Sequence, residues 1–189
     1  MPQTEYPSVF RTLLREARLP ALGPGTPNTQ LRAQLVALNL SAAFAPHEIH
    51  TAEMARACHA GLLLYHDLLE ESHAISQNIT NSTGSYWHGL MHRREPDYGN
   101  SKYWFHRVGA HEIFGELRER AAELAQTSAH ASAQFLREQT KWDPFAFIDL
   151  CEACTQGRSP EELLCRKIQL VEWQLLFAFS FRQAIGERA

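Results

Sequence analysis

The stretch 163-LLCRKIQLVEWQLLFAFSF-181 is the most apolar part of this sequence. Arg166, Lys167 and Glu172 interrupt it, so it lacks the run of about 20 apolar residues that a transmembrane helix requires. Its apolar residues recur at the spacing of a helix that is buried on more than one face. We therefore interpret the stretch as a long helix in the core of the protein, and we predict no membrane partner.

Helical spacing of apolar residues continues along nearly the whole chain, whereas the alternating runs typical of half-buried strands are hard to find. The 189 residues are enough for one substantial core, and a hydrophobic fraction of 44% with a charged fraction of 21% is typical of an ordinary globular protein. We predict the all-α fold class, with residues 1–189 forming a single-domain bundle of about eight helices.

Prolines and small polar residues that cap helices set the expected helix boundaries. Asp97 and Asp143 are predicted N-caps, and Ser159 with Glu162 resembles a capping box. Residues 78–85, NITNSTGS, are predicted to form a polar loop. Helices are expected at 8–17, 29–38, 51–77, 85–95, 98–108, 111–126 and 128–141, in a short segment between Ser41 and Pro46, and from Pro144 and Pro160 onward.

Charge and the N-terminal sequence exclude several classes of partner. The net charge of -3, from 18 basic and 21 acidic residues, gives no electrostatic basis for binding nucleic acid or an anionic membrane. The first twenty residues have no apolar core of signal-peptide length and carry acidic residues, so we expect a cytoplasmic location.

The four cysteines are too few for a disulfide framework, and we expect them to be reduced. Cys151 and Cys154 form a single C-x-x-C, with Cys165 eleven residues later. A zinc site would need a fourth ligand, so packed apolar thiols are the favoured interpretation and a metal or redox role is the alternative.

Histidine is unevenly distributed, because nine of the ten histidines lie between His47 and His111. On the helix expected over 51–77, His59, His66 and His73 are spaced by seven residues. Residues at this spacing drift only slowly around an α-helix, so the three imidazoles and Glu70 are predicted to share one polar stripe.

A second polar segment, 85-SYWHGLMHRREPDYGNSKYWFHR-107, points to a site. If residues 85–95 are helical, His88 and His92 are one turn apart and Glu95 lies three residues beyond, on the same face. Two imidazoles and a carboxylate can hold one divalent metal ion, such as Zn, Fe, Mn or Ni, and leave coordination positions open. His73, His66 or Glu70 would complete the ligand set.

The side chains around these ligands suggest the rest of a site. We assign Glu95, Arg93 and Arg94 to catalysis, with the arginines neutralising the charge of the substrate beside a metal-bound water. Arginine forks suit carboxylate or phosphate groups, and flat aromatic rings suit sugars or bases. The candidate ligand-binding residues are Trp87, Asp97, Asn100, Tyr103 and Arg107. As alternatives, the aromatic residues belong to the core, Asp97 and Asn100 are cap and turn residues, and Glu95 pairs with an arginine.

Two segments carry a resemblance: 70-EESHAISQ-77 and 84-GSYWHGLMHRREPDYGNSKYWFHRVG-109. Together they resemble a family of bacterial proteins without an established activity. Fungal proteins with a His-Arg-x-Glu-x-Asp segment are similar more loosely. The resemblance covers about residues 58–115, implies that the two segments form one unit, and transfers no catalytic role.

Other catalytic motifs are incomplete. No phosphate-binding glycine loop occurs, and HEIHT (47–51) and HEIFG (111–115) both lack the second histidine of a zinc-protease helix. The leading hypothesis is a metal-dependent enzyme acting on a small polar or anionic substrate. The alternatives are a metal-free module that binds an anionic molecule or a protein partner, and a purely structural polar network.

Overall fold

The apolar stretch at the C-terminal end of the sequence forms α11 (Glu162–Ala184), the longest helix of the structure. The structure is a computed structural model that describes residues 5–187. Within α11, Leu176, Phe177 and Phe181 are at most 2% exposed, so the helix is a central part of the core. It packs against α4 (Ala52–Tyr65), α8 (Phe114–Ala125) and α10 (Pro144–Thr155).

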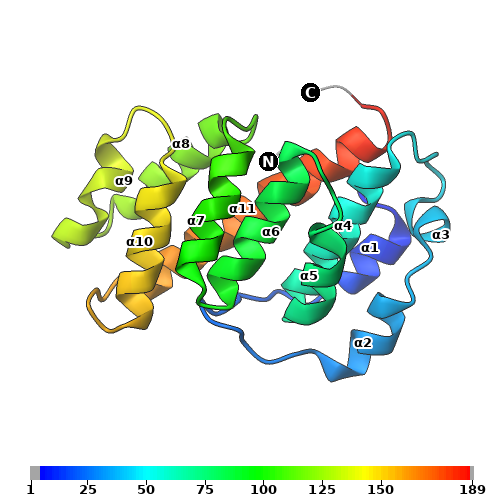
Figure 1. The fold of residues 1–189 in the computed structure, drawn as a ribbon, viewed down its shortest axis with the longest axis horizontal. Coiled ribbons are helices and arrows are strands. Elements are labelled where there is room, and N and C mark those ends of the chain that lie inside the picture. Colours follow the sequence, from blue (N-terminus) through cyan, green and yellow to red (C-terminus); the bar gives the residue numbers. More distant parts are fainter. Residues whose placement is uncertain (1–4, 188–189) are drawn as a thin grey trace.

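All regular elements in residues 5–187 are helical, which confirms the predicted all-α class. In Figure 1, α5, α6, α7 and α10 stand side by side in front of α11. The described part of the chain contains eleven α-helices and one short 3-10 helix, η1, rather than about eight helices. The remaining elements are α1 (Ser8–Leu13), α2 (Thr29–Val36), α3 (Leu40–Phe44), α5 (Leu69–Ser76), α6 (Ser82–Arg94), α7 (Tyr98–Val108), η1 (Ala131–Ala133) and α9 (Gln134–Glu138). Among the described helices, none combines the length and apolar character that crossing a membrane requires.

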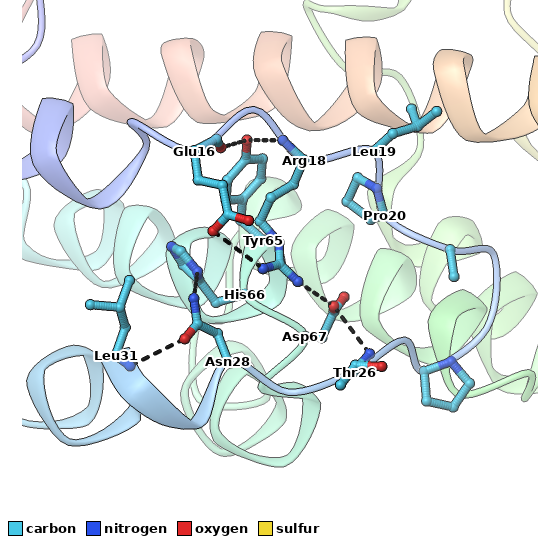
Figure 2. Close-up of polar contacts among 12 residues, drawn as sticks. Glu16, Arg18, Leu19, Pro20, Thr26, Asn28, Leu31, Tyr65, His66 and Asp67 are labelled. Atoms are coloured by element: carbon cyan, nitrogen blue, oxygen red, sulfur yellow. Dashed lines mark hydrogen bonds and ion pairs between the residues drawn. The ribbon is translucent and has the colours of Figure 1, made fainter.

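The prediction of one helix over 51–77 is wrong, because the chain turns between α4 and α5. Asp67 takes a left-handed backbone conformation, with φ of 58°, which an α-helix does not contain. Its carboxylate accepts hydrogen bonds from Arg18 Nη2 at 2.6 Å, Arg94 Nη2 at 2.5 Å and the Thr26 backbone N–H at 3.3 Å. Figure 2 shows the first and third of these bonds. Contacts from distant parts of the chain thus hold the break in place.

The long connection between α1 and α2, residues 14–28, runs over this break (Figure 2). The Tyr65 hydroxyl donates to the Glu16 carbonyl at 2.9 Å and accepts from the Arg18 N–H at 3.1 Å. Asn28 contacts His66 at 3.2 Å and also caps α2 by accepting from the Leu31 N–H. These bonds satisfy the polar groups of an irregular segment that would otherwise be costly to bury.

Some of the other helix boundaries lie where the capping residues and prolines predict them, and some do not. Asp97 caps α7 and Asp143 caps α10, with Pro144 at the first position, as predicted. The prediction of a capping box at Ser159 is wrong, because α11 starts only at Glu162 and its N-cap residue makes no side-chain hydrogen bond. Asn39, rather than Ser41, caps α3. The helices expected at 111–126 and 128–141 are shorter, covering 114–125 and 131–138, and the predicted loop 78–85 ends at Ser82, where α6 begins.

A buried ion pair joins α6 to the core helix α11. Arg93 and Glu172 are both 0% exposed, and Arg93 Nη2 donates to Glu172 Oε2. The Tyr86 hydroxyl donates to the other oxygen of Glu172 at 2.8 Å. Glu172, one of the three charged residues that interrupt the apolar stretch, is therefore paired inside the protein.

Removing one partner of this pair should be costly. We expect Glu172→Ala to lower the free energy of unfolding by about 3–5 kcal/mol, because it leaves the Arg93 charge buried without a counter-ion. Urea denaturation measures the change, and Glu119→Ala, which removes the exposed partner of Arg118, is the control, with an expected loss of about 0–1 kcal/mol. Equal losses of unfolding free energy in the two variants would contradict a stabilising role of the buried Arg93–Glu172 pair.

Candidate metal centre

Three histidines from two helices come together between α5 and α6. His88 and His92 lie one turn apart on α6, and His73 lies on α5. One nitrogen from each of the three rings lies within 4.8 Å of the other two. His88 and His92 are 2% and 5% exposed, and His73 is half-buried. We call His73, His88 and His92 the histidine cluster; its geometry can hold a metal ion.

The local sequence explains why α5 and α6 meet here. Only five residues, 77–81, connect α5 to α6, so the two helices are neighbours. Asn81 caps α6 by accepting from the Gly84 N–H at 2.9 Å. Gly84 permits the tight connection, because a Cβ there would lie 2.3 Å from the Ile79 carbonyl oxygen. Histidines at i and i+4 then lie on the face of α6 that meets α5.

Hydrogen bonds fix the orientation of two of the rings. His92 Nδ1 lies 3.0 Å from Glu95 Oε2, and His88 Nδ1 lies 2.9 Å from the Ser76 hydroxyl. The Nε2 atoms of His88 and His92 face each other at 3.0 Å. An ionised carboxylate only accepts, so the His92 proton is on Nδ1 and its Nε2 carries a lone pair.

The protons of the remaining bonds can be arranged in two ways. In the first, the Ser76 hydroxyl donates to His88 Nδ1, and His88 Nε2–H donates to His92 Nε2. In the second, His88 carries its proton on Nδ1 and donates to Ser76, whose hydroxyl donates to the His73 carbonyl at 3.4 Å. Two Nε2 lone pairs then face each other, which is favourable only with a cation between them. Both arrangements keep the rings neutral.

Burial favours neutral imidazoles in the histidine cluster. Burial lowers the pKa of His88 to about 3, and the neighbouring His92 and His73 add to this effect. Burial also lowers the pKa of His92, although the Glu95 carboxylate acts in the opposite direction. Neutral imidazole is the form that binds metals, so neither ring has to lose a proton to the solvent at neutral pH.

Helix α7 forms the third side of the cluster. The Trp104 ring packs edge-to-face on His88, with the ring centroids 4.2 Å apart. The Asn100 amide nitrogen lies 3.1 Å from His92 Nε2 and 3.4 Å from His92 Nδ1. The site is thus bordered by α5, α6 and α7.

Other predicted ligands lie elsewhere. His66 Nε2 lies 2.9 Å from the Leu13 carbonyl oxygen, in the break between α4 and α5. His59 Nε2 lies 2.6 Å from the Leu35 carbonyl oxygen, and Glu70 is exposed. The predicted stripe on one long helix therefore does not form, because the turn at Asp67 gives α5 its own direction.

The two arginines assigned to catalysis form ion pairs with carboxylates outside the histidine cluster. Arg93 pairs with Glu172 and packs over the Phe147 ring, and Arg94 pairs with Asp67. Both side chains are at most 3% exposed, so the structure places them in the interior. Glu95, by contrast, contacts the cluster through His92 and is 37% exposed.

The candidate ligand-binding residues are divided between core, cap and surface. Trp87 is fully buried, and its indole N–H donates to Ser180 at 3.1 Å; a Cβ at Gly61 would lie 2.7 Å from its ring. Asp97 caps α7, and Tyr103 is 55% exposed. Asn100 lies at the cluster, as described above, and Arg107 lies over Trp104.

Sequence reasoning missed Ser76 as a residue of the site. It lies three residues after His73 on α5, so it shares a helix face with that histidine. This spacing was visible in the segment EESHAISQ, but the contact with His88 depends on the pairing of α5 with α6.

The cysteines are free and buried, in accordance with packed thiols. Cys154 Sγ and Cys165 Sγ lie 3.8 Å apart. Burial raises the pKa of the Cys58 and Cys154 thiols, which disfavours the reactive thiolate.

Comparisons of the chain with protein-family models, with curated protein sequences and with solved structures found no match. The resemblance noted for about residues 58–115 therefore stays a prediction, and the site is interpreted from its geometry alone.

Acid should destabilise the protein through His88. The folded-state pKa is lowered to about 3, so the unfolded chain binds a proton first, and stability is lost as pH falls below about 6.5. In metal-free protein, we expect His88 to contribute about 1–3 kcal/mol of this loss between pH 6.5 and pH 4.5. Urea denaturation at several pH values should show a shallower loss for His88→Gln than for the wild type. The exposed control His106→Gln should keep the wild-type slope, and the same slope in His88→Gln would contradict a buried neutral His88.

Proposed function

We propose that the protein binds one divalent metal ion through His73, His88 and His92 and uses it to act on a small polar or anionic substrate. The observation that carries this proposal is the convergence of three ring nitrogens within 4.8 Å of one another. Two nitrogens bound to one tetrahedral zinc at about 2.0–2.1 Å lie about 3.4 Å apart. The Nε2 atoms of His88 and His92, at 3.0 Å, are close to this separation, and a ring nitrogen of His73 lies within 4.8 Å of a ring nitrogen of each.

The ligand chemistry favours a metal of intermediate softness. Three imidazoles suit Zn, Ni, Cu or Fe, whereas Mg and Ca prefer oxygen ligands, as does Mn to a lesser degree. Among these metals we favour zinc, because three neutral protein ligands and a water molecule form a tetrahedral site.

The proposed chemistry follows from the neutral ligands. Three imidazoles leave the full charge of the metal in place, so a water in the open position becomes acidic. Such a water can serve as the nucleophile of a hydrolysis or hydration, or as a general base. Glu95 would act through His92: its carboxylate would keep the His92 proton on Nδ1, so that the lone pair of His92 Nε2 faces the metal.

A second candidate is a metal-free polar network that fixes the packing of α5, α6 and α7. The chain of bonds from Ser76 through His88 and His92 to Glu95 can be closed with every donor satisfied. Closed networks of this kind stabilise one arrangement of buried helices. Metal binding distinguishes the two candidates.

The first test is metal uptake by protein purified without a histidine tag. We expect one zinc ion per chain in titration calorimetry, and a higher melting temperature, because a ligand that binds only the folded state stabilises it. His88→Ala and His92→Ala should each weaken binding by more than about 100-fold. The exposed His130→Ala should have no effect. If the wild-type protein binds none of Zn, Ni, Cu and Fe stoichiometrically, the metal proposal fails and the polar network is favoured.

The second test concerns the groups that orient the ligands. We expect Ser76→Ala and Glu95→Gln to weaken zinc binding by about 10–100-fold while the three histidines remain. Ser72→Ala is the matched control, since Ser72 is also buried on α5 but donates to the Ala60 carbonyl. A purely structural role for Ser76 would instead give Ser76→Ala and Ser72→Ala the same zinc affinity.

A further inference from the structure

We infer that the ligand at the open position of the metal is an oxyanion, the carboxylate or phosphate group of a small molecule, held by Asn100 and Arg107 of α7. This inference rests on the proposed metal site and adds the class of molecule that the site receives.

Asn100 places a hydrogen-bond donor beside the atom that would bind the metal. Its amide nitrogen lies 3.1 Å from His92 Nε2 and 3.4 Å from His92 Nδ1, so the amide N–H donates to the lone pair of Nε2. A metal bound to Nε2 would take up that lone pair, and the amide N–H would then need an acceptor on another ligand of the metal. The residue is half-buried in the first turn of α7, where Asp97 accepts from its backbone N–H at 3.1 Å. The donor is therefore held in place.

Arg107 supplies positive charge next to Trp104. Its guanidinium carbon lies 5.2 Å from the centroid of the Trp104 ring, which itself packs on His88. In the described chain, no carboxylate lies within ion-pair distance of Arg107. The other arginine and lysine side chains between residues 93 and 107 all have such partners: Arg93 with Glu172, Arg94 with Asp67 and Lys102 with Asp149.

The charges near the site agree with an anionic ligand. A metal on three neutral imidazoles keeps its full charge, and an arginine fork matches the geometry of a carboxylate or phosphate. The nearest acidic groups point elsewhere: Glu95 bonds to Nδ1 of His92, on the side of the ring away from Nε2, and Asp97 caps α7. The charge of the metal, the Asn100 donor and Arg107 would all disfavour a cation or an amine here.

The experiment uses the full-length protein loaded with Co²⁺, whose visible spectrum reports a change of its fourth ligand. Acetate and inorganic phosphate are titrated separately, so that their affinities distinguish a carboxylate from a phosphate ligand. In protein saturated with Co²⁺, we expect Arg107→Ala and Asn100→Ala each to weaken anion binding by about tenfold or more. Asn100→Asp, which replaces the donor by a negative charge, should weaken it further.

Arg118→Ala, which removes a partly exposed arginine on α8, is the control and should bind both anions as the wild type does. Arg107→Lys should recover only part of the affinity, because it restores the charge without the fork. If Co²⁺ binds but the anions bind all variants equally, or do not bind at all, the oxyanion inference is overturned and the metal site stands. If Co²⁺ does not bind to the wild type, the proposed function fails, and this inference fails with it.

Discussion

The arrangement of the site depends on two buried ion pairs at the C-terminal end of α6. Arg93 binds Glu172 on α11, and Arg94 binds Asp67 between α4 and α5. Adjacent residues on a helix point about 100° apart, so the two pairs fix the rotation of α6 about its axis. Each pair is at most 5% exposed, and a buried charge without its partner is strongly destabilising, which leaves α6 little freedom to turn.

With that rotation fixed, the face of α6 that carries His88 and His92 can only meet α5 and α7. His73 approaches from α5, and Trp104 and Asn100 approach from α7. The arginines that the sequence places beside the histidines are paired with distant carboxylates, and these pairs hold α6, the helix that carries two histidines of the cluster.

The break between α4 and α5 has a related role. A continuous helix would carry His66 and His73 on one stripe, but the left-handed Asp67 separates them. His66 then satisfies the α1–α2 connection, while His73 becomes free to face His88. The residue whose carboxylate pairs with Arg94 is thus also the one whose backbone separates His66 from His73.

The sequence by itself determined what depends on neighbours along the chain. The helical class followed from apolar spacing, α7 from the Asp97 cap, and the relation of His88, His92 and Glu95 from positions three and four residues apart on one helix. Only the tertiary structure decided which of the other polar residues join them. The partners of Arg93 and Arg94 lie 79 and 27 residues away, and no local pattern records such pairings. The physical reason is that helix spacing and capping act within about one turn, whereas the burial of charge is settled by whichever distant group can neutralise it.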